Sequence, residues 1–390
     1  MAKIRVGILF GGQSSEHEVS LASARSIMTA MDPAKYEIVP IGITKHGTWL
    51  LKGDPMEALR SGEYDDEYDA EAPHAASLLA THLDNRGHAE IVQFAGSGSN
   101  GAHALTAEVS ASLDVIFPVL HGPMGEDGTI QGLLEHAGIP YVGSGVLGSA
   151  VGMDKWMMKD VFTARGLPIV PHVALTRDEW ESDPGGTQRM AELELRYPMF
   201  AKPSNMGSSV GVCKIHGPDE FAAALSMAAR YDRRLVIEQG VDARECECAV
   251  LGNNRPEVSV VGEVVPGNEF YDYRAKYLDD NSDLFIPADL PAAISRRIRD
   301  LALRAFKAVD AAGMARVDFF VARDFSEVWL NEINTIPGFT AISMYPKLWE
   351  ASGLSYPALI DRLVELAVER YGEQQRNRAA LSDVGSELSV

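Results

Sequence analysis

Residues 315–338, ARVDFFVARDFSEVWLNEINTIPG, restrict the fold more than any other part of the chain. Apolar and polar side chains alternate on both sides of a short turn at 323–327, which is the period of two expected of an antiparallel β-hairpin. A hairpin symmetric about Phe325 places Asp318 opposite Glu332 and Arg316 opposite Asn334, all four on one face. We also expect Val328 and Leu330 on that face, since they alternate in step with Glu332.

Two carboxylates that face each other on a sheet repel, so this face requires a cation. A hard divalent ion with oxygen ligands, most simply Mg²⁺, suits Asp318, Glu332 and Asn334 together. The alternative is a solvated hairpin face on which Arg316 neutralises one acid. The hairpin alone does not decide between them.

Composition narrows the class of protein. The chain has 390 residues, 46% of them hydrophobic, which is enough for two or three globular domains. Its formal charge of −20 and pI near 4.9 argue against nucleic acid or an anionic membrane as partners. An anionic ligand must therefore be held by local Lys, Arg and backbone N–H groups. The three cysteines are too few for a disulfide framework. The apolar N-terminal run is too short for a signal peptide, and no stretch is long enough to span a bilayer, so a cytoplasmic location is expected.

The N-terminal part is expected to form a doubly wound α/β unit. A buried strand at 3–10 ends in two glycines, a helix follows to about residue 31, and further strands are predicted at 36–43, 114–120 and 139–142. Residues 51–112 are acidic and then rich in Gly and Ser, which indicates a surface insertion with one strand at 90–94.

Two glycine-rich stretches follow. Residues 143–148, GSGVLG, match the dinucleotide fingerprint, but no acid ends the next strand, so a nicotinamide or flavin site is disfavoured. One helix, 147–165, is predicted after it and contains Lys155. The second stretch, 203–211, lies between strands at 197–202 and from 212 onward, with Lys202 entering it. Its backbone N–H groups and serines suit a lid over a triphosphate, although an ordinary Gly-Ser hairpin has the same composition.

The remaining candidates lie further along the chain. A strand at 234–239 ends in Glu238, and Glu245 precedes a strand at 249–252; such acids can accept from an exocyclic amine or a ribose hydroxyl, or be surface charge. Residues 270–277, FYDYRAKY, have the make-up of a loop that closes over a ligand. An amphipathic helix is predicted from Pro291 to Gly313, another at 356–371, and a polar tail after it.

Several of these stretches, in order, resemble one family. They are GGQSSEHEVSL at 11–21, HGPMGEDGTIQG at 121–132, GSGVLGSAVGMDK at 143–155, KPSNMGSSVGV at 202–212, EFYDYRAKY at 269–277, ARVDFF at 315–320 and NEINTIPGFTAISMYP at 331–346. Together they resemble the ATP-grasp superfamily, and within it the D-alanine–D-alanine ligases. The resemblance implies an ATP-grasp fold of mixed α/β and α+β type. A doubly wound, Rossmann-like N-terminal domain is followed by two α+β domains that sandwich ATP. The implied boundaries are 1–143 for the N-terminal domain, 144–237 for the central domain, 238–372 for the C-terminal domain and 373–390 for the tail.

The resemblance also implies a role for each site residue. Nucleotide contacts fall on Lys155, Lys202, Ser208, Ser209, Glu238, Glu245, Phe270 and Lys276. Asp318, Glu332 and Asn334 hold Mg²⁺, expected as two ions that Mn²⁺ can replace. Glu18 binds the ammonium of the first D-alanine and joins Ser208 and Tyr277 in a hydrogen-bonded lid. Arg316 and the Gly338 N–H stabilise the oxyanion, Ser343 positions the second carboxylate, and His121 and Met344 complete the substrate site.

The implied reaction joins two D-alanines through D-alanyl phosphate, giving D-alanyl-D-alanine, ADP and phosphate for peptidoglycan and cell-wall synthesis. The alternative is an ATP-grasp ligase that takes D-lactate or D-serine as its second substrate. Tyr277 favours an amine nucleophile, because the D-lactate-using relatives carry a histidine there. Like its relatives, the protein is expected to be a homodimer.

Overall fold

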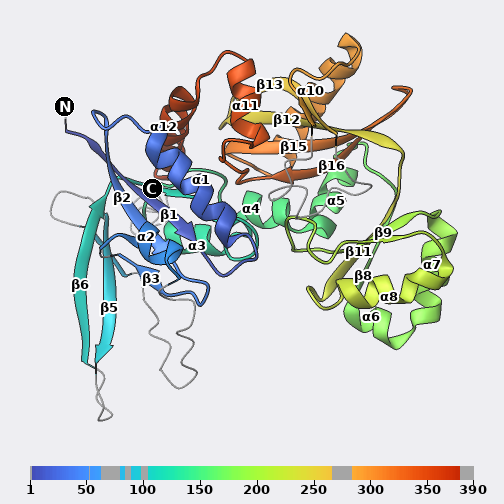
Figure 1. The fold of residues 1–390 in the computed structure, drawn as a ribbon, viewed down its shortest axis with the longest axis horizontal. Coiled ribbons are helices and arrows are strands. Elements are labelled where there is room, and N and C mark those ends of the chain that lie inside the picture. Colours follow the sequence, from blue (N-terminus) through green and yellow to red (C-terminus); the bar gives the residue numbers. More distant parts are fainter. Residues whose placement is uncertain are drawn as a thin grey trace, which may run out of the picture.

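The computed structural model describes residues 2–51, 53–62, 80–83, 89–97, 104–265 and 283–377. They form four β-sheets with helices packed around three of them (Figure 1). The chain passes from an N-terminal α/β unit through a central unit to a C-terminal sheet, and its last helix returns to the first unit. This order of elements fits the expected mixed α/β and α+β fold.

The N-terminal sheet is parallel at its centre, as the strand–glycine–helix pattern predicted. Its strands run in the order β3 (Trp49–Leu50), β2 (Tyr36–Ile43), β1 (Ile4–Gly11) and β7 (Val115–Pro118). Its helices are α1 (His17–Ala30), α2 (Pro55–Arg60) and α3 (Thr129–His136). The strand predicted at 139–142 is reduced to a single parallel bridge between Ile116 and Tyr141.

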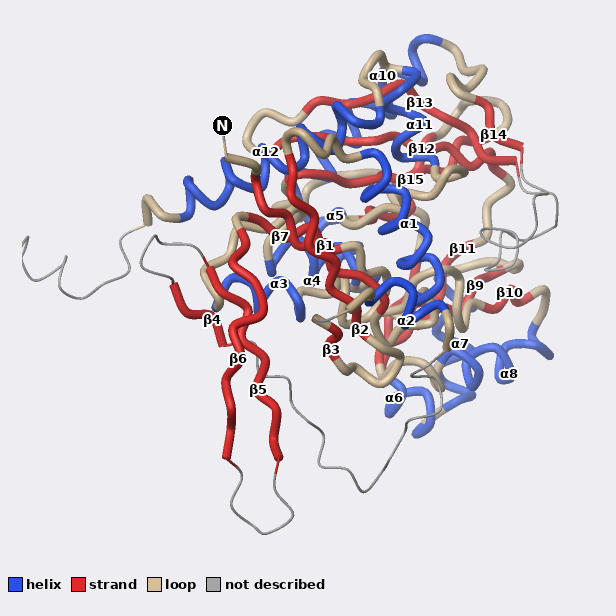
Figure 2. The backbone as a smooth tube through the Cα atoms, turned by 60° about the vertical axis from the view of Figure 1, so that its left-hand side comes forward, coloured by secondary structure: helices blue, strands red, loops and turns tan. Residues whose placement is uncertain are grey.

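The insertion contains more structure than the one strand predicted. It forms an antiparallel sheet of β4 (Ala80–Leu83), β5 (Ala89–Ser97) and β6 (Ala104–Leu113). Strands β5 and β6 extend away from the rest of the molecule (Figure 2). The C-terminal end of β6 lies against the N-terminal unit, where Leu113 is buried in its core.

The central unit holds an antiparallel sheet in the order β10 (Cys213–Ile215), β9 (Met199–Pro203), β11 (Arg234–Gln239) and β8 (His172–Thr176). Helices α6 (Arg177–Ser182), α7 (Pro184–Glu194) and α8 (Pro218–Ala228) pack on it. The single helix predicted at 147–165 is wrong: the chain forms α4 (Val146–Met153) and α5 (Lys155–Ala164), separated by Asp154 in an extended conformation. The Asp154 carboxylate caps α5 by accepting from the Met157 N–H at 3.0 Å.

The C-terminal sheet has the order β14 (Asp283–Phe285), β13 (Glu257–Val265), β12 (Ala243–Gly252), β15 (Gly313–Ala322) and β16 (Val328–Asn334). Helix α10 (Ala292–Ala308) covers one face, and α11 (Met344–Ala351) and α12 (Tyr356–Gln374) pack on the other. Helix α10 ends at Ala308, before the stop that the sequence predicted at Gly313, and Gly313 is instead the first residue of β15.

The predicted hairpin is present as β15 and β16. The expected pairs Arg316–Asn334 and Asp318–Glu332 are confirmed. A β-bulge beyond Asp318 then shifts the register, so Phe319 pairs with Leu330 and Asn331 is the extra residue. The expected position of Val328 and Leu330 is therefore wrong: both lie in the core with Ile333, on the face opposite Glu332.

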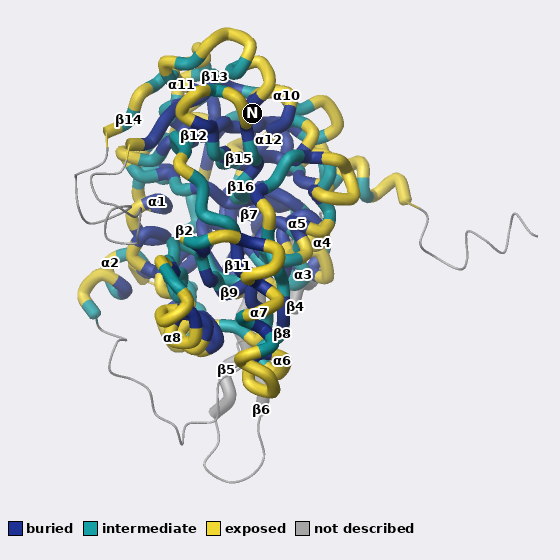
Figure 3. The backbone as a smooth tube through the Cα atoms, turned by 90° about the vertical axis from the view of Figure 1, so that its right-hand side faces the viewer, coloured by how far each residue is buried: buried dark blue, intermediate teal, exposed yellow. Residues whose placement is uncertain are grey.

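Figure 3 shows the buried residues gathered in the interior and the exposed ones on the outer helices and loops. The buried side chains form several distinct cores. One core joins α1 and β1 of the N-terminal unit to α11 and α12, and a second lies between α10 and the C-terminal sheet. The central unit has a core of its own, built on Leu175, Phe221 and Leu235. Among the described helices, none has the length and apolar character needed to cross a bilayer.

Candidate active site

The site face of the hairpin is a network of paired charges. The Arg316 guanidinium donates to both Asp318 carboxylate oxygens, at 2.8 and 2.7 Å, and lies 3.0 Å from Glu247 Oε2. The Asn334 amide nitrogen donates to Asp318 at 3.1 Å. Glu247 belongs to β12 and pairs in register with Asp318. Arg316 therefore offsets the repulsion between the carboxylates, because it lies between Asp318 of β15 and Glu247 of β12.

Lys155 connects this hairpin to the glycine-rich loop. It is the first residue of α5, its Nζ donates to the Met206 carbonyl at 2.8 Å, and it lies 3.7 Å from Glu332 Oε2. The break at Asp154 fixes this position, because the Asp154 carboxylate also accepts from the Ser204 hydroxyl and forms an ion pair with Arg234. The start of α5 is therefore fastened to the ends of β9 and β11.

A second charge cluster lies beneath the glycine-rich loop. Glu238 receives Lys202 Nζ at 2.7 Å and has Lys159 Nζ 3.0 Å from its other oxygen. Burial alone would raise the pKa of Glu238, but the two lysines outweigh it and hold that pKa far below its usual value. Burial also acts to lower the pKa of Lys202, yet Glu238 more than offsets it, so the pKa of Lys202 is raised. This pair remains ionised at neutral pH.

The glycine-rich loop contacts the N-terminal unit through Ser208. Its hydroxyl donates to the carboxylate of Glu16. A Cβ at Gly207 would lie 2.6 Å from Glu16 Oε2, so any larger residue here would require the Glu16 carboxylate to shift. Ser208 and Ser209 both take left-handed φ angles, 49° and 59°, as expected of a tight phosphate-binding type of turn.

The partner expected for Ser208 was Glu18, and that expectation is wrong. Glu16 precedes α1 and is buried, whereas Glu18 lies in the first turn of the helix, with 68% of its side chain exposed and an ion pair to Lys45 at 3.3 Å. The same motif therefore offers two glutamates in different surroundings, and only Glu16 contacts the glycine-rich loop.

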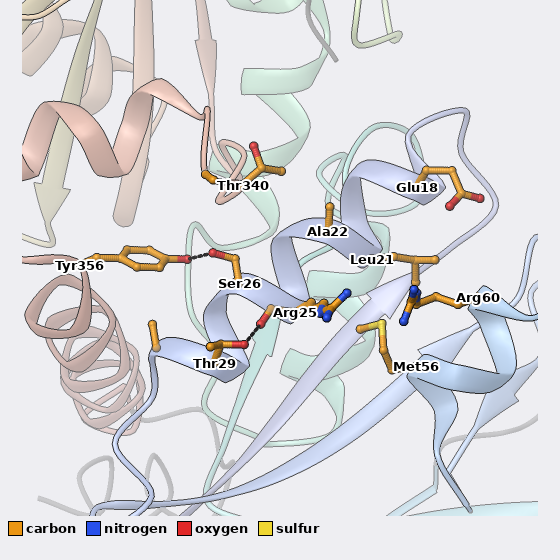
Figure 4. A pocket seen from close by; sticks show the side chains of 12 residues that line it. Glu18, Leu21, Ala22, Arg25, Ser26, Thr29, Met56, Arg60, Thr340 and Tyr356 are labelled. Carbon is orange, nitrogen blue, oxygen red and sulfur yellow. Dashed lines mark hydrogen bonds between the residues drawn. The ribbon is translucent and has the colours of Figure 1, made fainter. Parts of the chain in front are cut away.

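Glu18 instead lines a separate hollow of about 750 Å³ on the outer side of α1 (Figure 4). Arg25, Arg60 and Tyr356 also line it, between α1, α2 and the start of α12. Among the described residues, no lysine lines this hollow. We therefore place the chemistry where the glycine-rich loop meets Glu16 and the hairpin, and not here.

Two further buried groups border Glu16. His121 contacts the Ile336 carbonyl at 3.0 Å and the Ser23 hydroxyl at 3.3 Å, and burial lowers its pKa. Glu126 accepts from the Gly122 N–H at 3.0 Å. Burial, reinforced by the charge of Glu16, raises the pKa of Glu126 well above its usual value. His121 therefore stays neutral, and Glu126 favours its protonated form.

The loop after β16 brings Gly338 and Ser343 together. The Ser343 hydroxyl accepts from the Thr340 N–H at 2.9 Å, and a Cβ at Gly338 would lie 2.8 Å from it. The Phe339 N–H donates to Ser23, which also meets His121, so this loop is tied to α1. Met344 departs from expectation, because its side chain is buried in the core and not at the site.

Not every expected residue can be placed. Phe270, Lys276 and Tyr277 lie outside the described residues. Glu245 is one alternation before Glu247 on β12, and its charge helps to raise the pKa of Lys202. Ser209 follows Ser208 in the glycine-rich loop.

Sequence reasoning missed Glu16, Lys159, Glu247 and Glu126. Helical and strand spacing could have found two of them: Lys159 lies four residues after Lys155, and Glu247 lies two after Glu245. Nothing in the sequence favoured Glu16 over Glu18 without a known helix start.

The residues fit a divalent cation in their chemistry. Asp318 and Glu332 face each other, and the Asn334 amide can present its oxygen once the hydrogen-bond network changes. Within the described ranges, no group of three His, Cys, Asp or Glu side chains is placed to hold a metal ion. Mg²⁺ is commonly held by one or two carboxylates together with the phosphates of a substrate.

Comparison with known proteins assigns the family. The model of the D-ala D-ala ligase N-terminus matches residues 5–144, and that of the D-ala D-ala ligase C-terminus matches residues 161–365. D-alanine–D-alanine ligases of Acetivibrio thermocellus and a Thermoanaerobacter species are each 50% identical, over 95% and 96% of this chain and 97% and 99% of theirs.

Solved structures agree with these relatives. The D-alanine-D-alanine ligase of Coxiella burnetii is 40% identical with a TM-score of 0.76, covering 96% of this chain and 97% of its own. The VanG D-Ala:D-Ser ligase of Enterococcus faecalis is 33% identical with a TM-score of 0.76, covering 94% of this chain and 100% of its own.

Proposed function

Because the chain belongs to the D-alanine–D-alanine ligase family, we propose that it joins two D-alanines at the expense of ATP, for peptidoglycan precursor synthesis. The γ-phosphoryl group passes to a carboxylate oxygen of the first D-alanine, with ADP leaving. The amine of the second D-alanine then attacks the carbonyl carbon of this acyl phosphate. Phosphate leaves with the bonding electron pair, the amine loses a proton, and D-alanyl-D-alanine remains.

The observation that carries this proposal is the meeting of three units at one site. Glu16 comes from the N-terminal unit, Ser208 from the central unit, and Arg316 with Glu332 from the C-terminal hairpin. Ser208 donates to Glu16, while Lys155 lies between the Met206 carbonyl and Glu332. A reaction that orients a nucleotide and two amino acids requires such convergence, since positioning supplies much of its rate.

We assign the nucleotide to the central side of this junction. Lys155 and Lys202 are placed to donate to phosphate oxygens, and Ser208 and Ser209 add hydroxyl and backbone N–H donors. Glu245 suits the exocyclic amine or the ribose hydroxyls. Glu238 was expected to share that role, but both of its carboxylate oxygens lie on lysines, so we assign it to holding Lys202. Phe270 and Lys276 keep their expected roles as predictions.

We assign the amino acids to the side facing α1. Glu16, and not Glu18, takes the ammonium of the first D-alanine, with Ser208 linking it to the lid and Tyr277 expected beside it. Arg316 and the Gly338 N–H would stabilise the oxyanion, a contribution that is commonly the largest in acyl transfer. Ser343 would receive the second carboxylate, and neutral His121 borders the site.

Asp318, Glu332 and Asn334 would hold Mg²⁺, which when bound neutralises charge on the phosphates. Glu332→Gln, which removes one charged ligand, should lower kcat by about 10²- to 10⁴-fold at saturating Mg²⁺ while the circular dichroism spectrum is unchanged. Glu327→Gln, in the exposed turn of the same hairpin, is the matched control. Near-normal turnover of Glu332→Gln would show that the metal face is misassigned.

Phosphate release with ATP, Mg²⁺ and a panel of acceptors tests the function. D-Alanine should stimulate release and yield a dipeptide, while L-alanine should not. Assays with D-serine or D-lactate, each together with D-alanine, test the alternative second substrates. The relative at 50% identity is named a D-alanine–D-alanine ligase, which does not favour this alternative. No stimulation by D-alanine would refute the proposal.

Two expectations remain proposals. We expect a homodimer, which sedimentation equilibrium would measure. A cytoplasmic location follows from the use of ATP, and cell fractionation would check it.

A further inference from the structure

Lys159 is a buried charge that the roles above do not use. It lies on α5 one turn after Lys155, and no part of its side chain is exposed. Its Nζ lies 3.0 Å from Glu238 Oε1, on the side of that carboxylate away from Lys202. A buried lysine is costly, because burial opposes its charged form, so its presence here calls for a reason.

Charge counting supplies that reason. Lys202 and Glu238 alone would form a neutral pair, and Lys202 would have little net field to offer an anion. With Lys159 on the second oxygen, Glu238 is shared between two lysines. Burial lowers the pKa of Lys159 and the charge of Glu238 acts against that shift; with Lys159 protonated, the three groups carry one net positive charge. Lys202 keeps 13% of its side chain exposed toward the nucleotide side, whereas Lys159 exposes none.

The groups around this cluster act on it less strongly than its own members do. His172 pairs in register with Glu238, but burial lowers its pKa and leaves it neutral. Glu332 and Glu245 act on Lys202 less strongly than Glu238 does. In a chain with a formal charge of −20, a local positive cluster is required if a polyphosphate is to bind.

Building on the proposed function, we propose that Lys159 is a positioning residue that sets the charge of the nucleotide site from beneath, without touching the nucleotide. It holds Glu238 so that Lys202 can bind phosphate, and its effect should grow with the charge of the ligand.

Calorimetric titration of the full chain with ADP and with adenosine, both with Mg²⁺, tests this. Lys159→Met should weaken ADP binding about tenfold, the order expected for one charge lost several ångströms from a phosphate in a site of intermediate dielectric constant. Adenosine binding should be unchanged. Lys307→Met, on the exposed face of α10, removes the same charge elsewhere and should bind both ligands as the wild type does.

A charge-keeping variant keeps the test decisive. Lys159→Arg retains a positive charge beside Glu238 and leaves both Glu238 and Lys202 in place. Its ADP affinity should lie within about threefold of wild type. If Lys159→Met does not fold, this variant alone decides, and a tenfold loss of ADP affinity in it overturns the proposal.

Other results are equally clear. Unchanged ADP affinity in Lys159→Met overturns the role of Lys159, as does an equal loss for ADP and adenosine, which would indicate a structural role. Failure of the wild-type chain to bind ADP would instead refute the proposed function.

Discussion

Glu16 and Glu18 provide the sharpest comparison between individual side chains. Glu16→Gln should lower kcat/KM for D-alanine by about 10- to 100-fold, because a buried carboxylate that receives Ser208 would lose its charge opposite an ammonium. Glu18→Gln should stay within about twofold of wild type, since the side chain is exposed and its pair with Lys45 lies at the surface. Steady-state kinetics with varied D-alanine measures both. The reverse order would restore Glu18 to the site.

Glu126 gives a pH dependence of known sign. In the folded state burial, and next the charge of Glu16, raises its pKa above 4.5, so the folded chain holds this proton more tightly than the unfolded chain. This contribution is present below pH 4.5 and is lost as pH rises toward the folded pKa. Glutamine mimics the protonated acid.

Glu126→Gln should therefore become increasingly more stable than wild type as pH rises above 4.5, with the advantage gone below pH 4.5. Urea unfolding across this pH range measures the difference. The exposed Glu350→Gln should show no such trend. A stability loss in Glu126→Gln at pH 8 would mean that the ionised acid is required.

The break between α4 and α5 is a functional element. Asp154→Ala removes the α5 cap and the contacts to Ser204 and Arg234, so it should cost about 1–2 kcal/mol of stability and raise KM for ATP about tenfold by freeing Lys155. Asp183→Ala is the matched control, since Asp183 caps α7 in the same way, distant from the site. It should lose similar stability with KM unchanged. Equal KM values for ATP in the two variants would show that the contacts of Asp154 do not contribute to nucleotide binding.

Strands and their pairing could be predicted from the sequence, whereas the β-bulge in β16 and the break between α4 and α5 could not. Strand β11 follows from its short apolar run, and the pairing of Asp318 with Glu332 follows from alternation and a recognisable turn. The bulge at Asn331 reversed the faces of Val328 and Leu330, because one extra residue changes the parity of a strand. The break at Asp154 was hidden for a related reason: its partners Ser204 and Arg234 lie far along the chain. Tertiary contacts decided both.

Across the molecule, the separate core of the central unit predicts uneven dynamics. The contacts between this unit and its neighbours at the site are largely polar, such as Ser208 with Glu16 and Lys155 with Glu332. Adding ADP and D-alanine should therefore slow amide hydrogen exchange in 202–211 by about tenfold or more, and change β1 little. Mass spectrometry of peptic fragments measures this. Uniform protection would indicate that the three units already move as one body.

The core shared by α1, β1 and α12 also has a consequence for synthesis on the ribosome. Phe10 and Ile27 pack in the same cluster as Phe339 and Leu363, more than three hundred positions later. At about 5–20 residues per second, the first unit waits on the order of tens of seconds for the helix that completes it. During that interval its apolar surface is a natural target for chaperones, and a chain released before α12 emerges would leave that surface uncovered.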